Sequence, residues 1–173
     1  MALRSTGARA WRRTAFAALL LFSGVQPVLK SAEAAPNPLA DMAGSWSGTG
    51  TIKLASGDNE RIRCRATYTL GNNGRSVQQD LRCASDSYKF DVESDFSYNA
   101  DAGIVSGTWA ETNYATGGFF TGTVSGGSIN ARVEGRSFKA TVAVNTSGDQ
   151  QSVTIRPQGT DVTEVAVTMQ RTG

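Results

Sequence analysis

The chain has 173 residues, which suits one ordinary domain with room for a core. It has no histidine, which excludes catalysis by an imidazole base, His-containing zinc sites and histidine-ligated haem. Residues 1–34 hold 5 of the 17 basic and 1 of the 15 acidic residues, so the formal net charge of +2 becomes −2 without them, with 12 basic against 14 acidic residues. The charge therefore does not indicate a nucleic-acid or anionic-membrane partner.

Residues 1–34 are typical of a cleaved secretory signal peptide. Arginines precede the apolar run FAALLLFSGV, and small residues lead to the Ala-Glu-Ala of positions 32–34. We predict cleavage after Ala34 and no transmembrane segment afterwards, because a bilayer-spanning helix needs about 20 apolar residues. The pair Arg12-Arg13 leaves a twin-arginine route open. We prefer the general secretory route, because such pairs are common in basic leaders.

Residues 35–45 are predicted to form a short tether that ends in one helical turn at 38–43, stopped by Gly44. From Trp46 to the end, apolar and polar residues alternate with a period of two, in short runs separated by Gly, Asn, Asp and Ser. This pattern predicts a single all-β domain over 46–173.

The domain contains about eight to ten strands by this criterion. The candidate strands are 46–54, 60–70, 75–84, 87–98, 103–112, 116–125, 128–134, 137–145, 150–156 and 161–171. The links between them are of hairpin length, so consecutive strands are expected to be antiparallel neighbours in an up-and-down meander.

One face of this meander is apolar and must be covered. The stretch 88–98 shows the alternation best, with apolar Tyr88, Phe90, Val92, Phe96 and Tyr98 opposite polar Lys89, Asp91, Glu93 and Asp95. With no helix available, the sheet can close into a barrel or fold into a β-sandwich. We prefer the barrel, because short links leave little room for the crossing connections of a sandwich. Inward-facing glycines would lie where strands bend sharply, at Gly48, Gly50, Gly107 and Gly122.

Both cysteines belong to one predicted hairpin. Asn73-Gly74 is a strong signal for a type I′ turn, which needs a positive φ at both central residues. That turn places Cys64 opposite Cys83, where a Cα separation of about 5.5 Å suits a disulfide. We predict a structural bridge on the inner face of the sheet, because a reactive thiol needs exposure and an electropositive setting.

The same register puts four arginines on the outer face. They are Arg61, Arg63, Arg65 and Arg82, and Arg65 lies across from Arg82. One interpretation is a surface that binds a phosphate, a carboxylate or an anionic glycan. The simpler interpretation is a solvated face whose arginines pair with Asp91, Glu93 and Asp95 on the next strand.

Those three carboxylates also raise a hydrolase hypothesis, since alternate residues of a strand are about 7 Å apart, within the rough range of inverting glycosidases. Exposure argues against it, because a raised pKa needs burial. No catalytic residue, metal ligand or cofactor is predicted.

Five aromatic residues are candidates for the barrel interior or for contact with a ligand: Trp46, Tyr68, Phe90, Trp109 and Phe120. An inward tryptophan is more often core than ligand contact, because it buries the most surface. In the stretch YATGGFFTG at 114–122, one of the adjacent Phe119 and Phe120 must point outward. An exposed aromatic side chain beside glycines fits a portal or contact loop, or simply a ragged strand end.

The stretch AGSWSGTGTI at 43–52 resembles the start of the calycin barrels, the lipocalins and their relatives, in which Gly-x-Trp follows a helical turn and begins the first strand. The resemblance implies that a basic residue late in the barrel packs across Trp46. Arg171 is the candidate.

A longer resemblance covers most of the chain after residue 34. Its segments are GSWSGTGTIKLASG, ERIRCRATY, LRCASDSYKFDV, VSGTWAET and QSVTIRPQGTDV, and they are similar to uncharacterised small exported proteins of alphaproteobacteria. That likeness implies residence in a Gram-negative periplasm.

Together these observations predict an exported, non-enzymatic binding protein. The calycin likeness implies a small apolar or amphipathic ligand in or near the barrel mouth. The alternative is an envelope protein that contacts a macromolecule or an anionic glycan through its arginine face, and nucleic acid is not an expected partner.

Overall fold

A computed structural model describes residues 37–173, so the predicted signal peptide and its cleavage site lie outside the described residues. Within this range, no helix has the length and apolar character needed to cross a membrane. The strands are β1 (Gly44–Leu54), β2 (Asn59–Gly71), β3 (Ser76–Ala84), β4 (Lys89–Asn99), β5 (Ile104–Glu111), β6 (Thr116–Ser125), β7 (Ser128–Gly135), β8 (Lys139–Ser147), β9 (Gln150–Gln158) and β10 (Val162–Arg171). Two short 3-10 helices, η1 (Ala40–Met42) and η2 (Asn72–Gly74), complete the described structure.

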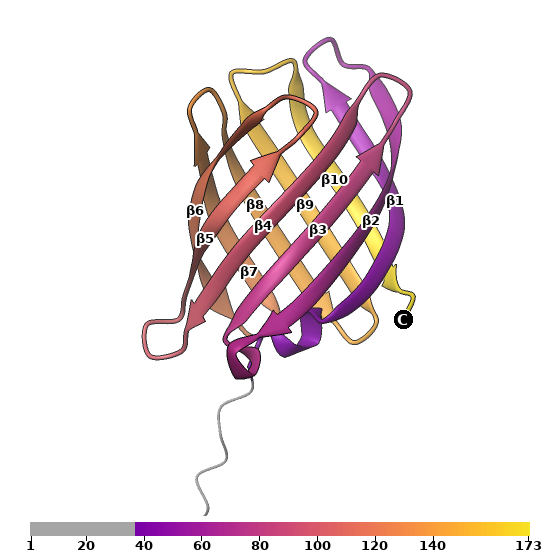
Figure 1. The fold of residues 1–173 in the computed structure, drawn as a ribbon. Coiled ribbons are helices and arrows are strands. Elements are labelled where there is room, and N and C mark those ends of the chain that lie inside the picture. Colours follow the sequence, from indigo (N-terminus) through magenta and orange to yellow (C-terminus); the bar gives the residue numbers. More distant parts are fainter. Residues whose placement is uncertain (1–36) are drawn as a thin grey trace, which may run out of the picture. The chain divides into compact units, whose positions relative to one another are not determined.

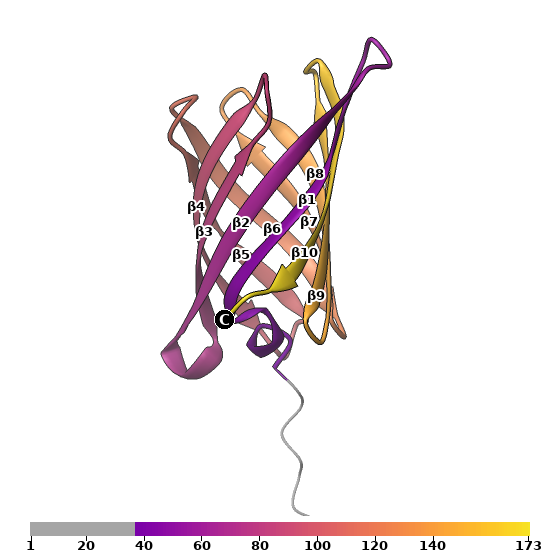
Figure 2. The same ribbon diagram turned by 90° about the vertical axis from the view of Figure 1, so that its right-hand side faces the viewer.

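The ten strands form one closed antiparallel barrel in which each strand pairs with its neighbours in the chain and β1 pairs with β10 (Figures 1 and 2). The predicted up-and-down barrel is therefore confirmed, and the β-sandwich alternative is wrong. All ten strands begin and end within two residues of their predicted bounds. The period-two pattern sufficed to place the strands because one face of every strand is turned toward the barrel interior and the links are too short to change the neighbouring strand.

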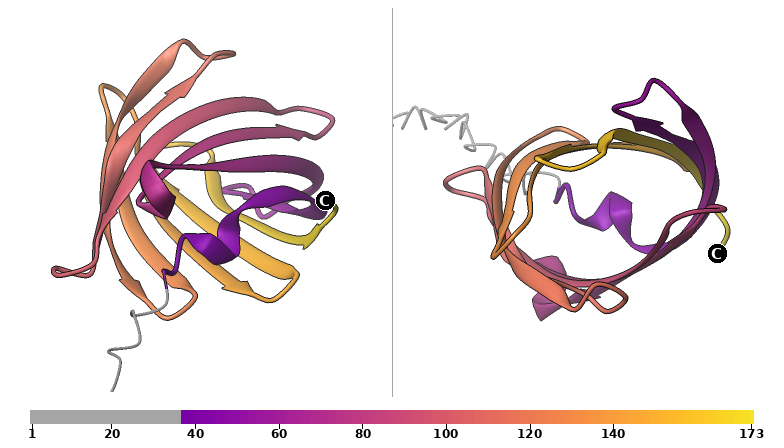
Figure 3. Two further views of the ribbon diagram at one scale, coloured as in Figure 1. Left: turned by 60° about the horizontal axis from the view of Figure 1, so that its bottom comes forward. Right: turned by 90° about the horizontal axis from the view of Figure 1, so that it is seen from above.

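One end of the barrel is closed by the N-terminal segment. Figure 3 shows η1 lying across this end, inside the ring of strands. Leu39 and Met42 are buried there, and the Trp46 indole N–H donates a 2.8 Å hydrogen bond to the Met42 carbonyl. The predicted turn over 38–43 exists, but it is shorter, and β1 begins at Gly44 rather than at Trp46. Gly44 has a φ of 113°, a conformation that glycine adopts readily, and so turns the chain from η1 into the strand.

Arg171 at the end of β10 ties this closed end to the barrel. Its guanidinium lies 4.3 Å from the centroid of the Trp46 ring, a cation–π contact. It also donates hydrogen bonds to the carbonyls of Ala43 and of Asp41, the latter at 2.7 Å, and to the Asp149 carboxylate at 3.1 Å. The predicted packing of a late basic residue across Trp46 is thus confirmed.

The closure between β1 and β10 needs two glycines. Gly48 and Gly50 face the interior opposite Met169 and Val167, and a Cβ at either glycine would overlap the carbonyl oxygen of Thr168 or Ala166. Any side chain here would push the first and last strands apart. The glycines therefore permit a close approach of backbone to backbone.

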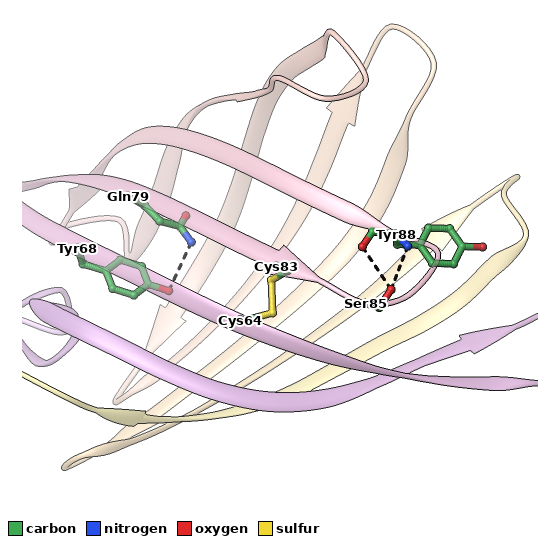
Figure 4. Close-up of a disulfide and its surroundings, with 6 residues drawn as sticks. All are labelled: Cys64, Tyr68, Gln79, Cys83, Ser85 and Tyr88. Atoms are coloured by element: carbon green, nitrogen blue, oxygen red, sulfur yellow. Dashed lines mark hydrogen bonds between the residues drawn. A yellow bond between two sulfur atoms is a disulfide. The ribbon is translucent and has the colours of Figure 1, made fainter.

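The β2–β3 hairpin has the predicted register. Cys64 pairs with Cys83 and the two form a disulfide (Figure 4). The chain turns at the predicted Asn73-Gly74, but the link between the strands is residues 72–75 rather than two residues, and Asn72, Asn73 and Gly74 all have a positive φ, of 49°, 55° and 84°. The Cα separation is 4.1 Å rather than the expected 5.5 Å, because a non-hydrogen-bonded antiparallel pair brings the two strands closer at that point.

The disulfide is expected to stabilise the fold by restricting the unfolded chain. The cysteines are 19 residues apart, and a loop of that size corresponds to about 3 kcal/mol of unfolding free energy. Replacing both by alanine (C64A/C83A) should lower the free energy of unfolding by about that amount in urea titrations. Wild-type protein unfolded with a reductant should match the double variant, and equal stability with and without the bridge would contradict the prediction.

Candidate functional site

The five predicted interior aromatic residues all face the barrel axis, but the structure divides them into two groups. Trp46 and Tyr68 are fully packed in the closed half, whereas Phe90, Trp109 and Phe120 keep part of their surface exposed in the rest of the barrel. The closed half is therefore core. The candidate site lies toward the opposite, open end.

The polar side chains of the closed half satisfy one another. The Tyr68 hydroxyl donates a 2.9 Å hydrogen bond to the Gln151 amide oxygen, and the Gln151 amide nitrogen donates to Thr146 at 3.1 Å. Gln79 approaches the Tyr68 hydroxyl from the neighbouring strand at 3.4 Å (Figure 4). Burial raises the pKa of Tyr68 far above its ordinary value despite these hydrogen bonds, so the phenol stays neutral. This network needs no ligand to complete it.

The open half is packed unevenly around the barrel. On β1, β2 and β10, inward-facing Ile52, Ile62 and Val165 are buried. On β4 to β8, Ala140 of β8 is buried, but six inward-facing apolar side chains are only partly buried: Phe90, Val92, Trp109, Phe120, Val133 and Val142. A barrel of ten strands is wider than the eight-stranded kind that side chains just fill, so short side chains such as valine leave this wall exposed to solvent.

Trp109 on β5 is the largest side chain of this wall. It pairs with Gly118 on β6, and Gly118 pairs with Gly135 on β7. A Cβ at Gly135 would lie only 2.9 Å from the Trp109 ring, so these glycines let the indole lie flat along the wall and reach Phe138 at a centroid distance of 5.6 Å. The buried indole N–H has no acceptor among the described residues, and an unpaired donor of this kind costs about 1–3 kcal/mol.

Tyrosines from two loops extend the aromatic wall to the rim of the open end. Tyr88, just before β4, stacks on Phe90 with centroids 6.1 Å apart, and Tyr114, in the β5–β6 loop, lies at the same distance from Phe90. Tyr114 is 56% exposed. Sequence reasoning did not include Tyr114 in the site, because loop residues have no period that shows which way they point. Its signal in the sequence was its place at the start of the glycine-rich stretch 114–122, for which a portal or contact loop was one interpretation.

The predicted division of the adjacent phenylalanines is confirmed. Phe119 points outward and is 59% exposed, while Phe120 points inward and contacts Phe96 edge to face at 5.6 Å. Phe119 therefore belongs to the outer surface of β6 and not to the open-end wall.

Two carboxylates on the inner face secure the rim of the open end. Glu111, only 5% exposed, accepts hydrogen bonds from the backbone N–H groups of Asp91, Asn113 and Tyr114 and from the Asn113 side chain. Burial alone would raise its pKa, but these hydrogen bonds outweigh burial and lower the pKa below its ordinary value. Glu60 on β2 likewise accepts the Ser87 N–H, and hydrogen bonds from Ser85 and Ser87 lower its pKa. Both groups are ionised at neutral pH.

The arginine face is on the outside of β2 and β3, as predicted, with Arg65 directly opposite Arg82. Arg82 pairs with Asp91 at 3.3 Å. Within residues 37–173, Arg61, Arg63 and Arg65 form no ion pair with any carboxylate. The acidic strand β4 therefore pairs with Arg82 only, because β3 separates β2 from β4 and places Asp80 and Arg82 between them.

The outward carboxylates do not gather into a catalytic site. Asp91 pairs with Arg82, Glu93 lies opposite Asp80, and Asp95 borders a shallow groove with Gln78 near the closed end. In the described part of the chain, no three Cys, Asp or Glu side chains come together as metal ligands. The directly facing pair of acids, Asp80 and Glu93, lies on the exposed outer face, and the inner wall is apolar and partly exposed.

Solved structures with the same barrel exist, although no protein-family model and no curated protein matches the sequence. The S-type phycobiliprotein lyase CPES from Guillardia theta superposes with a TM-score of 0.57 at 12% identity, over 78% of this chain and 90% of the lyase. Rv2717c from M. tuberculosis gives a TM-score of 0.60 at 14% identity, over 80% of this chain and 99% of that protein. At such identities the likeness is one of fold, a closed antiparallel barrel.

Glu111 generates a prediction with a definite pH dependence. Because its pKa is lowered in the folded state from an ordinary 4.5, its contribution to stability is fully present above pH 4.5 and is lost as the pH falls through the folded-state pKa. Glu111→Gln should therefore reduce the free energy of unfolding at pH 7 by about 1.5–3 kcal/mol, and the gap from wild type should shrink toward pH 3. Urea titrations at several pH values measure this gap.

The matched control is Glu134→Gln, an exposed glutamate on the outer face of β7. It should leave stability unchanged at each pH. A gap between wild type and Glu111→Gln that stayed constant from pH 7 to pH 3 would contradict the assignment.

Proposed function

We propose that this protein is a non-enzymatic binding protein that holds a small apolar or amphipathic ligand against the inner wall of β4 to β8 at the open end of the barrel. The observation that carries the proposal is the half-buried state of inward-facing apolar side chains such as Val92, Val133 and Val142. A ligand that covered them would gain roughly 25 cal/mol for each Å² of apolar surface removed from water.

Three further features support a ligand at this end. The opposite end is blocked by η1 and held by Arg171, so the open end is the way in. The rim is aromatic, with Tyr88 and Tyr114 beside Phe90, and aromatic side chains are common in ligand sites. One solved structure of the same fold, CPES, is a phycobiliprotein lyase.

We also infer that the protein acts outside the cytoplasm, in a Gram-negative periplasm, after cleavage following Ala34. The basic and apolar N-terminal sequence supports export. So does the paired state of both cysteines, because disulfides persist in oxidising compartments. A non-enzymatic role agrees with the outer-face position of Asp91, Glu93 and Asp95, away from the apolar wall.

A larger side chain on the inner wall of the open half should weaken the binding of an apolar ligand. N-phenyl-1-naphthylamine, an uncharged apolar dye that fluoresces in apolar surroundings, is expected to bind saturably to the protein from residue 35 onward. Val142→Trp places an indole against the inner wall and should weaken dye binding at least tenfold in a fluorescence titration. The matched control, Thr141→Trp, adds the same group to the exposed outer face one residue away and should leave binding unchanged.

Two outcomes would overturn the proposal. One is the absence of saturable dye binding by folded wild-type protein. The other is equal binding by Val142→Trp and wild type, with both variants shown to be folded by their thermal unfolding.

A second candidate function is supported by the arginine face. Arg61, Arg63 and Arg65 project from alternate positions of β2 without ion-pair partners in the described chain, and they are flanked on β1 by uncharged Ser47, Thr49 and Thr51. Guanidinium groups at regular spacing bind carboxylates and sulfates in pairs of hydrogen bonds. We propose an anionic envelope glycan as the partner of this face.

Retention on a sulfated polysaccharide tests the second candidate. The triple variant R61Q/R63Q/R65Q should elute from heparin-agarose at lower salt than wild type. A variant with the same charge change on β7, the β7–β8 link and β8, R132Q/R136Q/K139Q, serves as the control and should elute close to wild type. Equal shifts for both variants would show that only net charge matters and would remove this face as a specific site.

A further inference from the structure

The charges on the inner face at the open end are all of one sign. Of the described residues, those that face the barrel axis and carry a charge there are Glu60 and Glu111. The other inward-facing charge of the described chain, Arg171, is at the closed end and is occupied by Trp46, the η1 carbonyls and Asp149. An entering ligand therefore meets two carboxylates and no inward-facing cation.

Both carboxylates are fixed in place rather than free to turn away. Glu111 accepts its hydrogen bonds from three backbone N–H groups of β4 and the β5–β6 loop, at 2.6 to 3.2 Å. Glu60 accepts from the β3–β4 loop, which also carries Tyr88. The negative charges thus lie beside the aromatic rim formed by Tyr88, Phe90 and Tyr114.

Apart from Arg171, the rest of the inner wall, among the described residues, carries no positive charge that would neutralise an anion. Further in, the polar groups are uncharged, namely Gln79, Ser94, Tyr68, Gln151 and Thr146. An anionic head group would lose hydration on entry without gaining a counter-charge, whichever end of the ligand entered first. Electrostatic repulsion is stronger in such partly dehydrated surroundings than in water.

Resting on the proposed function, we infer that the ligand of this barrel is uncharged or cationic, and that Glu60 and Glu111 exclude anionic amphiphiles such as fatty acids. The inner wall supplies affinity through apolar contact, and the carboxylates supply selectivity by repulsion. Such selectivity comes from repulsion of anionic ligands and does not require an additional contact with an uncharged or cationic one.

Three amphiphiles with the same apolar chain test the inference. Dodecanol, dodecyltrimethylammonium and dodecanoate, each below its aggregation threshold at pH 7.5, compete with N-phenyl-1-naphthylamine for the wild-type protein. Dodecanoate should require at least a tenfold higher concentration for half-displacement than dodecanol, whereas dodecyltrimethylammonium should require no more than dodecanol.

Variants then assign the effect to the carboxylates. Glu60→Gln and, separately, Glu111→Gln should narrow the ratio between dodecanoate and dodecanol, because each removes one negative charge from the inner face. Glu134→Gln removes a charge from the outer face of β7 and should leave the ratio unchanged. Glu111→Gln could also loosen the β5–β6 loop. In that case the ratio between dodecanoate and dodecanol in Glu60→Gln, compared with the wild-type ratio, still tests the inference.

The failure of this inference is distinguishable from failure of the proposed function. If wild-type protein bound no dye, the proposed function itself would fall. If the dye bound and dodecanoate displaced it as readily as dodecanol, the barrel would remain a binding protein but the exclusion of anions would be wrong. If Glu134→Gln narrowed the ratio between dodecanoate and dodecanol as much as Glu60→Gln and Glu111→Gln do, these two carboxylates would not be the cause of the selectivity.

Discussion

The fold depends on the pairing of the first and last strands. β1 and β10 must meet in register, from Trp46 opposite Arg171 to Ile52 opposite Val165, or the sheet has two unpaired edges. Gly48 and Gly50 permit that meeting because they have no side chain to hold the two backbones apart. Closure removes every exposed edge, which protects an all-β chain from pairing with other molecules.

The same junction decides which end of the barrel is open. Trp46 begins β1 and Arg171 ends β10, so their contact fixes η1 under the first strand through the Met42, Ala43 and Asp41 carbonyls. Leu39 and Met42 then fill the space between the strand ends. The Gly-x-Trp motif therefore has a structural role: it closes one end of the barrel and leaves the opposite end open.

Width produces the difference between the two sides of the barrel. Ten strands enclose more space than small side chains can fill, and the closely packed β1, β2 and β10 side takes up only part of it. The disulfide lies on this packed side with Trp46 and Tyr68, whereas the partly buried wall of β4 to β8 carries Phe90, Trp109 and Phe120. The disulfide and the proposed binding surface thus belong to different strands.

Charge is divided in a similar way between the two faces of the sheet. Arginines without partners in the described chain occupy the outside of β2, and carboxylates held by backbone N–H groups occupy the inner rim. The period of two sends neighbouring residues of one strand, such as Glu60 and Arg61, to opposite faces. A single strand therefore contributes opposite charges to two separate surfaces.

The sequence by itself determined the strands, their order and the Cys64–Cys83 register, because alternation, hairpin links and the Asn73-Gly74 turn are local or nearly local properties. The Gly-x-Trp likeness extended this to the contact between Trp46 and Arg171. Which interior residues are core and which stay exposed was decided only by the tertiary structure, since Trp46 and Trp109 have the same pattern in the sequence. Their difference arises from long-range closure: η1 and Arg171 cover Trp46, while Gly118 and Gly135, on other strands, leave Trp109 along an incompletely filled wall. The hydrogen-bond partners of Glu111 and the ion-pair partners of the arginines likewise depended on which strands are neighbours. That order is a property of the closed barrel.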